Sequence, residues 1–214
     1  MPTPVKKRAY DATRRRAAAL ETRRAVLRAA RDLFLGQGYA ATSVARVARR
    51  AGVSVDTVYT SVGRKPELLL AVVDMVLARG DEPVPAEERG YVRDVRAATT
   101  AREKIGIYAD ALAVVLPPAV PLLLALRAAG TTDDSCREMA TRISERRAAN
   151  MLLLAADLRA TGELRDDLTD QQVADLIWSM NSPDYYALVT GLGRTPQEFA
   201  ALLADVWTRT LLQS

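Results

Sequence analysis

The chain has 214 residues, of which 49% are hydrophobic and 26% are charged. These values are typical of a folded globular protein and lie outside the range of disordered or collagen-like chains. The sequence contains no histidine and one cysteine, Cys136, which excludes intrachain disulfides, imidazole or thiolate zinc sites and histidine-dependent acid–base catalysis. We therefore expect no metal site and no cofactor, although catalysis by Asp, Glu, Lys or Tyr alone stays open.

The net charge of +4 conceals an asymmetry between the two ends of the chain. Residues 1–70 hold 15 Lys and Arg against 5 Asp and Glu, a net charge of +10, whereas residues 71–214 have a net charge of −6. A basic segment attracts polyanions, with nucleic acid as the first candidate and an anionic membrane surface as the second. Within it, residues 1–20 form a basic arm that either reaches DNA phosphates or a minor groove, or remains a solvated tail.

No segment has the pattern of a membrane anchor or a secretion signal. The longest apolar stretch, residues 109–126, is interrupted by Asp110 and three prolines, so it offers no clean membrane span. The basic N-terminus is not followed by an apolar signal-peptide core. We expect a soluble, cytoplasmic protein that has no membrane partner.

Apolar residues recur with a helical period from residue 21 onward, and no segment shows the alternation of a strand. The fold class predicted is all-α. In the first part of the chain the pattern predicts helices from residue 13 or 21 to 35, and over 44–51, 55–61 and 66–79, with a linker at 80–85. Beyond the linker it predicts helices over 86–97, 101–116, 119–129, 134–160, 170–180, 183–191 and 196–212, with Pro117 and Pro118 separating two of them. The pairs Thr169 with Gln172 and Thr195 with Glu198 fit the capping-box pattern.

Two short helices separated by a turn at Gly52, inside a basic segment, predict a helix-turn-helix whose second helix enters the DNA major groove. The alternative is a helical hairpin inside a core. The apolar interior would contain Val44, Val47, Ala48, Val53 and Val58. This leaves short polar or methyl-bearing side chains for DNA, namely Ser54, Val55, Thr57, Tyr59, Thr60 and Ser61.

Residues Arg23 to Val73 resemble the DNA-binding domain of the tetracycline-repressor (TetR) family of bacterial transcription regulators. The matching elements are Ala30, Leu33-Phe34, Gly38-Tyr39, Thr42-Ser43-Val44, Val47-Ala48, Ala51-Gly52-Val53-Ser54, Thr57-Val58-Tyr59, and Lys65 followed by Leu68-Leu69. The resemblance implies that Thr57 and its neighbours meet DNA, that Tyr59 and Lys65 hold phosphates, and that the supporting helix starts at Thr42 and Ser43. The predicted DNA-binding set is Thr42, Ser43, Val44, Ser54, Val55, Asp56, Thr57, Tyr59, Thr60, Ser61 and Lys65.

The chain departs from the family pattern at two places in this segment. Thr60-Ser61-Val62 stand where the family often has an aromatic residue or His followed by Phe. Asp56 stands where a small or basic residue is more usual. Its carboxylate either accepts a hydrogen bond from cytosine N4 or stabilises the first turn through the helix dipole.

Residues 168–212 resemble the helices through which one group of these regulators dimerises. Two apolar stripes run through them, and such stripes belong either to an intrachain core or to a two-chain interface. We favour a homodimer with a four-helix interface. The predicted interface residues are Val173, Ile177, Met180, Phe199, Leu203, Val206 and Trp207.

The middle region, residues 86–165, resembles the family in length and helicity and is where such proteins hold an inducer. Its apolar side chains are mostly core, and its prolines could splay helices and leave a cavity. The predicted ligand-binding residues are Tyr108, Leu112, Leu116, Leu123, Met139, Ile143 and Met151. No basic residue in this stretch stands out as an anion partner, so a small hydrophobic or aromatic ligand is expected.

These observations predict a homodimeric DNA-binding regulator, a repressor released from a palindromic double-stranded operator by a small apolar ligand. The predicted domains are a basic arm (1–20), a helix-turn-helix domain (21–66), a connecting helix (67–80) and a ligand-binding and dimerisation domain (86–214). Two alternatives stay open. One is a helical enzyme using carboxylates such as Asp110, Glu138 or Asp157, and the other is a helical adaptor whose basic end binds a membrane or a protein.

Overall fold

The computed structural model describes the backbone of residues 6–213 and the side chains of residues 14–213. Within this part the chain is all-α and has no β-strand, which confirms the predicted fold class. It divides into two compact units, residues 1–72 (unit 1) and residues 73–214 (unit 2). The boundary falls inside one helix, α4 (Lys65–Ala78). The predicted basic side chains Lys6, Lys7 and Arg8 lie outside the described side chains.

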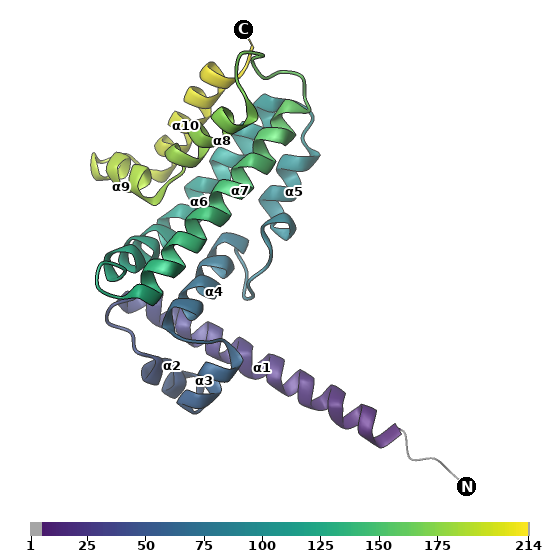
Figure 1. Cartoon of the computed structure of the whole chain (residues 1–214), viewed down its shortest axis with the longest axis vertical. Helices are drawn as coiled ribbons and strands as arrows, with labels where there is room; N and C mark the ends of the chain where they lie inside the picture. The colour runs from purple at the N-terminus through teal and green to yellow at the C-terminus, as the bar shows by residue number, and fades with distance from the viewer. Residues whose placement is uncertain (1–5, 214) are drawn as a thin grey trace. The chain divides into compact units, whose positions relative to one another are not determined.

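Unit 1 begins with a long helix followed by two short ones (Figure 1). The helices are α1 (Lys6–Gln37), α2 (Val44–Ala51) and α3 (Val55–Ser61). Helix α1 starts before the predicted position, because alanine and arginine favour helix even where nothing packs against it. Residues 14–21 are exposed accordingly. The predicted apolar face of α1 is buried, and it packs against Val47, Ala48 and Val58 in the core of the unit.

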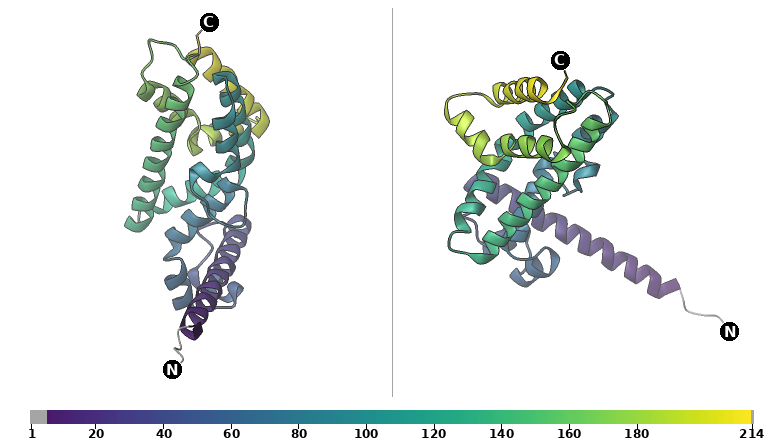
Figure 2. Two further views of the ribbon diagram at one scale, coloured as in Figure 1. Left: turned by 90° about the vertical axis from the view of Figure 1, so that its right-hand side faces the viewer. Right: turned by 45° about the horizontal axis from the view of Figure 1, so that its top comes forward.

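Unit 2 is built around two long antiparallel helices, α6 and α7 (Figures 1 and 2). Its elements are a short 3₁₀ turn η1 (Ala86–Glu88), α5 (Gly90–Ala97), α6 (Ala101–Ala129), α7 (Asp134–Arg159), α8 (Asp170–Met180), α9 (Pro183–Gly191) and α10 (Pro196–Leu211). Helix α6 packs against α5, α7, α9 and α10, while α8 packs on α7. The apolar side chains that meet along α6 form one continuous core.

The break predicted at Pro117 and Pro118 is wrong, because α6 runs through both and through Pro121 without interruption. Proline removes a backbone N–H and normally ends or kinks a helix. Here the flanking residues Leu116 and Ala119 are buried in the core, and this packing outweighs the local cost. By length and composition α6 is also the one described helix that could cross a membrane, and half of its most apolar window is buried inside the unit. Its place in the core explains its composition.

The helix predicted over 86–97 is also interrupted, at Arg89. This residue has an extended backbone (φ −69°, ψ 140°) between η1 and α5, and its side chain is buried and paired with Asp74. The ion pair with Asp74, 15 positions earlier in the chain, thus holds Arg89 where the predicted helix is interrupted. Helical periodicity alone does not reveal such a contact.

Three helices of unit 2 begin with capping boxes. Those of α8 at Thr169 and α10 at Thr195 confirm the prediction, and α6 has a third at Thr100. In each box the threonine hydroxyl accepts from the backbone N–H three residues later, and that residue's side chain accepts from the threonine N–H. Backbone N–H donation from the capping threonine lowers the pKa of Glu103 and of Glu198. The same spacing of threonine and glutamate occurs at Thr100 and Glu103 in the sequence, so this third capping box was also predictable.

Candidate DNA-reading surface and ligand pocket

The turn between α2 and α3 is built by local backbone chemistry. Gly52 has a left-handed conformation (φ 69°), which glycine adopts without the steric cost of a side chain. The Val53 N–H donates to the carbonyl of Ala48 at 3.0 Å, which closes the end of α2. The Ser54 hydroxyl accepts from the Thr57 N–H at 3.0 Å and so caps the start of α3. These contacts set α3 at an angle to α2, as a helix-turn-helix requires.

The outer face of α3 carries short side chains held by bonds within the helix. Ser54 Oγ and Thr57 Oγ1 are 2.8 Å apart and share a hydrogen bond, and the Thr60 hydroxyl donates to the Asp56 carbonyl at 2.9 Å. Ser54, Asp56, Tyr59 and Thr60 are exposed, while Val55, Thr57 and Ser61 are half-buried. Each hydroxyl keeps acceptor capacity, so the face can meet donors and methyl groups in a major groove.

Thr42, one of the predicted DNA-binding residues, has a structural role in the loop before α2. It is 2% exposed and its hydroxyl donates to the carbonyl of Gly38 at 2.9 Å, so it holds the loop between α1 and α2 and presents nothing to a partner. Ser43 is exposed and caps α2 by accepting from the Arg46 N–H at 3.3 Å. Val44 is half-buried.

The predicted phosphate contacts lie at the end of the α3 region. Tyr59 is 46% exposed, and the Lys65 ammonium lies 4.1 Å from the centre of the Tyr39 ring. The structure adds exposed arginines on α2, Arg46, Arg49 and Arg50, which sequence reasoning counted only in the net charge. Arg50 is paired with Asp32 of α1 at 2.8 Å. An exposed tyrosine hydroxyl and several cations near a reading helix suit phosphate contacts.

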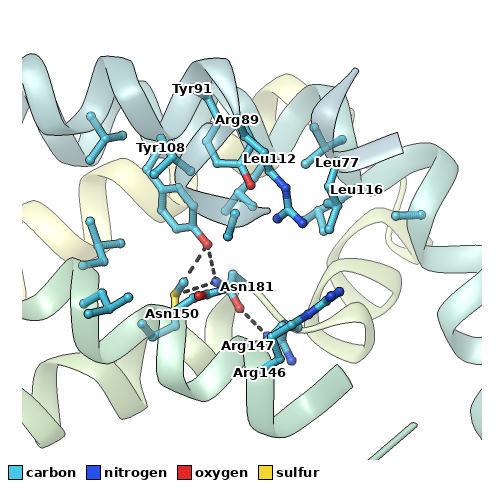
Figure 3. A pocket seen from close by; sticks show the side chains of 18 of the residues that line it. Leu77, Arg89, Tyr91, Tyr108, Leu112, Leu116, Arg146, Arg147, Asn150 and Asn181 are labelled. Atoms are coloured by element: carbon cyan, nitrogen blue, oxygen red, sulfur yellow. Dashed lines mark hydrogen bonds between the residues drawn. The ribbon is translucent and has the colours of Figure 1, made fainter. Parts of the chain in front are cut away.

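Unit 2 contains a pocket of about 150 Å³ between α4, α5, α6 and α7. Six of the seven predicted ligand residues line it, namely Tyr108, Leu112, Leu116, Leu123, Ile143 and Met151, whereas Met139 is buried elsewhere. Val73 and Leu77 from the second half of α4 also line it. The wall is mostly apolar, and polar side chains enter at one end (Figure 3). This composition is typical of a small-molecule site.

The polar end of the pocket is a connected hydrogen-bond network. The Asn181 amide donates to the Tyr108 hydroxyl at 2.7 Å, and this hydroxyl lies 3.5 Å from the sulfur of Met151. Arg147 donates to the Trp178 carbonyl at 2.9 Å and to the side-chain oxygen of Asn181. Burial raises the pKa of Tyr108, so its hydroxyl stays protonated at neutral pH.

The expectation that no basic residue faces the ligand region is wrong. Arg89, Arg146 and Arg147 all line the pocket. Arg89 and Arg146 share Asp74 of α4, with nitrogen–oxygen distances of 3.0 and 2.7 Å. In the sequence the pair at 146–147 has the appearance of a solvated helix face, and only the packing of α7 against α6 and α8 turns these side chains inward.

Comparisons with known proteins match the helix-turn-helix segment to a known family model. Residues 26–72 match the family model described as bacterial regulatory proteins, tetR family. The HTH-type transcriptional regulator HbdR of Aromatoleum sp. (strain CIB) is 32% identical over 75 residues, which cover 35% of this chain and 33% of that protein. The chain therefore aligns with only a third of the length of this curated relative.

Solved structures match over almost the whole chain. A transcriptional regulator from Saccharomonospora viridis in complex with choline has a TM-score of 0.66 and 18% identity, covering 91% of this chain and 99% of that one. NalD, the secondary repressor of the MexAB-OprM multidrug efflux pump in Pseudomonas aeruginosa, has a TM-score of 0.64 and 20% identity, covering 92% and 99%. The SmeT–triclosan complex has a TM-score of 0.67 and 18% identity, covering 90% and 92%.

The chain is therefore similar to tetR-family regulators over residues 26–72. The structural matches extend the fold to unit 2, where the family model does not reach.

The predicted dimer stripes lie inside unit 2. Val173, Ile177, Phe199, Leu203 and Trp207 are fully buried, Met180 is 9% exposed, and Val206 is half-buried. Trp207 stacks on Tyr108, with ring centres 6.0 Å apart. Side chains already enclosed by their own subunit cannot supply an interface, so these stripes form core. On the neighbouring helix α9, Leu188 and Leu192 are 66% and 80% exposed.

The structure does not bring together the carboxylates considered for an enzyme. Asp110 and Glu138 are exposed, and Asp157 is paired with the buried Lys104 at 3.0 Å. Glu138 and Asp157 lie roughly 28 Å apart along α7 at 1.5 Å per residue. The Lys104 ammonium also donates to the Val95 carbonyl at 2.9 Å, which satisfies the end of α5.

Proposed function

We propose that the chain is a DNA-binding transcriptional regulator, a repressor that acts in the cytoplasm and leaves its operator when a small ligand fills the pocket of unit 2. One observation carries the proposal. Helix α4 begins in unit 1, which bears α3, and its second half lines the pocket through Val73 and Leu77. The helix that leaves the reading unit therefore also supplies part of the cavity wall, so a ligand that displaces α4 can act on the reading unit.

DNA binding is supported by the charge and the surface of unit 1. Residues 1–70 have a net charge of +10, and α3 is short, capped and exposed along one face. We assign base contacts to Ser54, Val55, Asp56, Thr57, Thr60 and Ser61, and phosphate contacts to Ser43, Tyr59 and Lys65. Phosphate contacts fix register, and base contacts select sequence.

We propose further that the chain acts as a homodimer on a palindromic site. Two reading helices must lie about 34 Å apart, one DNA turn, to occupy successive major grooves. The exposed leucines of α9, Leu188 and Leu192, support an interface on this face of unit 2, since large apolar side chains left in solvent at one place mark association sites.

The dimer is tested by light scattering at micromolar concentration. The wild type is expected to be dimeric, and the double variant Leu188→Asp, Leu192→Asp is expected to be a folded monomer with weaker operator binding. Leu35→Asp, another exposed leucine (45% exposed) on α1 of unit 1, is the control and should remain dimeric. A monomeric wild type would contradict the proposal, and a dimeric double variant would remove α9 from the interface.

DNA recognition is tested by selecting duplexes from a random pool at low salt and titrating the selected sequence. Lys65→Ala should weaken binding to selected and unrelated duplexes alike and should lower the slope of log affinity against log salt by about one unit, because one counterion less is released. Thr57→Ala or Asp56→Ala should instead change the preferred sequence.

Glu87→Ala, an exposed residue of unit 2, serves as the control and should leave DNA binding unchanged. No duplex affinity of the wild type at low salt would overturn the proposal. A catalytic or membrane function would be favoured only by that result.

A further inference from the structure

The pocket carries more positive than negative charge at its polar end. Arg89 and Arg146 share one carboxylate, that of Asp74. Among the described residues Arg147 forms no ion pair, and its partners are the neutral oxygens of Trp178 and Asn181. The carboxylate of Asp157, also in the wall, is paired with Lys104. The wall also contains the exposed Arg96 and Glu87. Arg89, Arg146 and Arg147 therefore have one carboxylate among them, that of Asp74.

Arg89 has a buried donor that no described residue uses. The residue is 5% exposed, and its Nη2 donates to Asp74 at 3.0 Å. Its Nε is buried and has no hydrogen-bond partner among the described residues. An unpaired buried donor carries the desolvation cost of its group, and this cost is greater for a charged group. A ligand that supplies an acceptor to Arg89 Nε would remove this cost.

Arg147 faces the same pocket from α7. Its guanidinium lies 5.5 Å from the centre of the Trp178 ring, and burial lowers its pKa. Neutral oxygens satisfy hydrogen bonds but do not cancel a desolvated charge. Figure 3 shows Arg89 and Tyr91 on one side of the pocket and Arg146, Arg147 and Asn150 on the other. The guanidinium groups of Arg89 and Arg147 therefore enter the cavity from opposite walls.

The remainder of the pocket is apolar. Leu77, Leu112, Leu116 and Leu123 line it, and Figure 3 shows the first three on the same side as Arg89. A ligand that fits the whole cavity must combine a negative group with an apolar body.

We propose that the pocket binds an amphipathic monocarboxylate, with its carboxylate accepting hydrogen bonds from Arg89 and Arg147 and its hydrocarbon part lying among the leucines. A carboxylate matches the planar donor fork of a guanidinium. The volume of about 150 Å³ limits the body to a short chain or a single substituted ring. The same charge balance rejects cations. This inference rests on the proposed function, since it gives the ligand class of that regulator.

The test uses calorimetric titration of the full-length protein without DNA, with two probe series that differ only in the head group. One series is octanoate, octan-1-ol and octylammonium, and the other is 4-ethylbenzoate, 4-ethylbenzyl alcohol and 4-ethylbenzylammonium. In at least one series the acid should bind about tenfold or more tightly than the alcohol, as expected of charge-assisted hydrogen bonds, and the ammonium should bind most weakly. Equal or tighter binding of the alcohols or amines in both series, or no binding of either acid at millimolar concentration, overturns the proposal.

Variants separate recognition from structural support. Arg89→Met and Arg147→Met should each lower the affinity for the acid while leaving that for the alcohol nearly unchanged. Arg93→Met, an exposed arginine of α5 that is not among the lining residues of the pocket, should keep the wild-type ratio of acid to alcohol affinity. A substitution that only loosens the packing of the pocket would weaken the binding of acid and of alcohol equally. Such a result for both Arg89→Met and Arg147→Met would contradict the assignment.

The outcome is independent of DNA binding. Operator binding by a protein that does not prefer acids overturns this inference alone. A preference for acids in a protein without duplex affinity overturns the proposed function and keeps the assigned ligand class.

Discussion

The two units hold their polar groups in place in opposite ways. On α3 of unit 1 the hydroxyls of Ser54 and Thr60 bond to groups three or four residues away. In unit 2 the Asn181 amide meets Tyr108 across 73 positions, and Arg146 meets Asp74 across 72. The reading surface is organised locally, whereas the pocket depends on several helices packing correctly. A single substitution should therefore cost little stability in the first and much in the second.

The largest effect is expected for Trp207→Ala. The side chain is fully buried and stacks on Tyr108, so removing it should lower the free energy of unfolding by about 3–5 kcal/mol through lost burial and a residual cavity. Chemical denaturation followed by circular dichroism measures this loss. Leu192→Ala, at 80% exposure, is the control and should change stability little. A stable, folded monomer of Trp207→Ala would instead restore Trp207 to a dimer interface.

Asp74→Asn should cost about 3 kcal/mol, the range for removing one partner of a buried ion pair. The Asp74 and Arg89 side chains are 14% and 6% exposed, so the remaining charge is poorly solvated. Denaturation at neutral pH measures the loss. The matched control is Asp205→Asn, whose partner Arg209 is exposed, and which should cost a few tenths of a kcal/mol. Equal costs for the two variants would show that the pocket network contributes no more than a surface pair.

These predictions concern the part of the molecule that sequence reasoning described least well. The helix-turn-helix was predictable because Gly52 and Ser54 act through their own backbone neighbours, and the bounds of α2 and α3 match those expected. The buried helix stripes were also predictable, but periodicity cannot say whether a stripe faces its own chain or a second one. For this reason the prediction of Trp207 as a dimer-interface residue was wrong.

The polar end of the pocket was missed because its residues are far apart in sequence. Arg89, Arg147 and Asn181 come from three separate segments, and each alone has the appearance of a surface residue. The continuity of α6 was missed because local proline chemistry was weighed without the packing that outweighs it.

A smaller effect is expected for Ser54→Ala in unit 1. Losing the cap of α3 should reduce stability by about 1 kcal/mol and weaken binding to the selected duplex, because α3 frays at the end that enters the groove. Thermal unfolding and DNA titration measure the two effects. Ser43→Ala, which removes the cap of α2, should cost a similar amount of stability. A loss of several kcal/mol at Ser54 would show that unit 1 is as interdependent as unit 2.

The most direct test of the account measures coupling between the two units. The dissociation constant for the selected duplex is determined with and without saturating amounts of the tightest-binding carboxylate probe, and that of the probe with and without duplex. Linkage requires the same factor in both directions, and a hundredfold weakening corresponds to about 2.7 kcal/mol of differential binding. The account predicts that each ligand weakens binding of the other by this shared factor. Unchanged DNA affinity at probe saturation would contradict it.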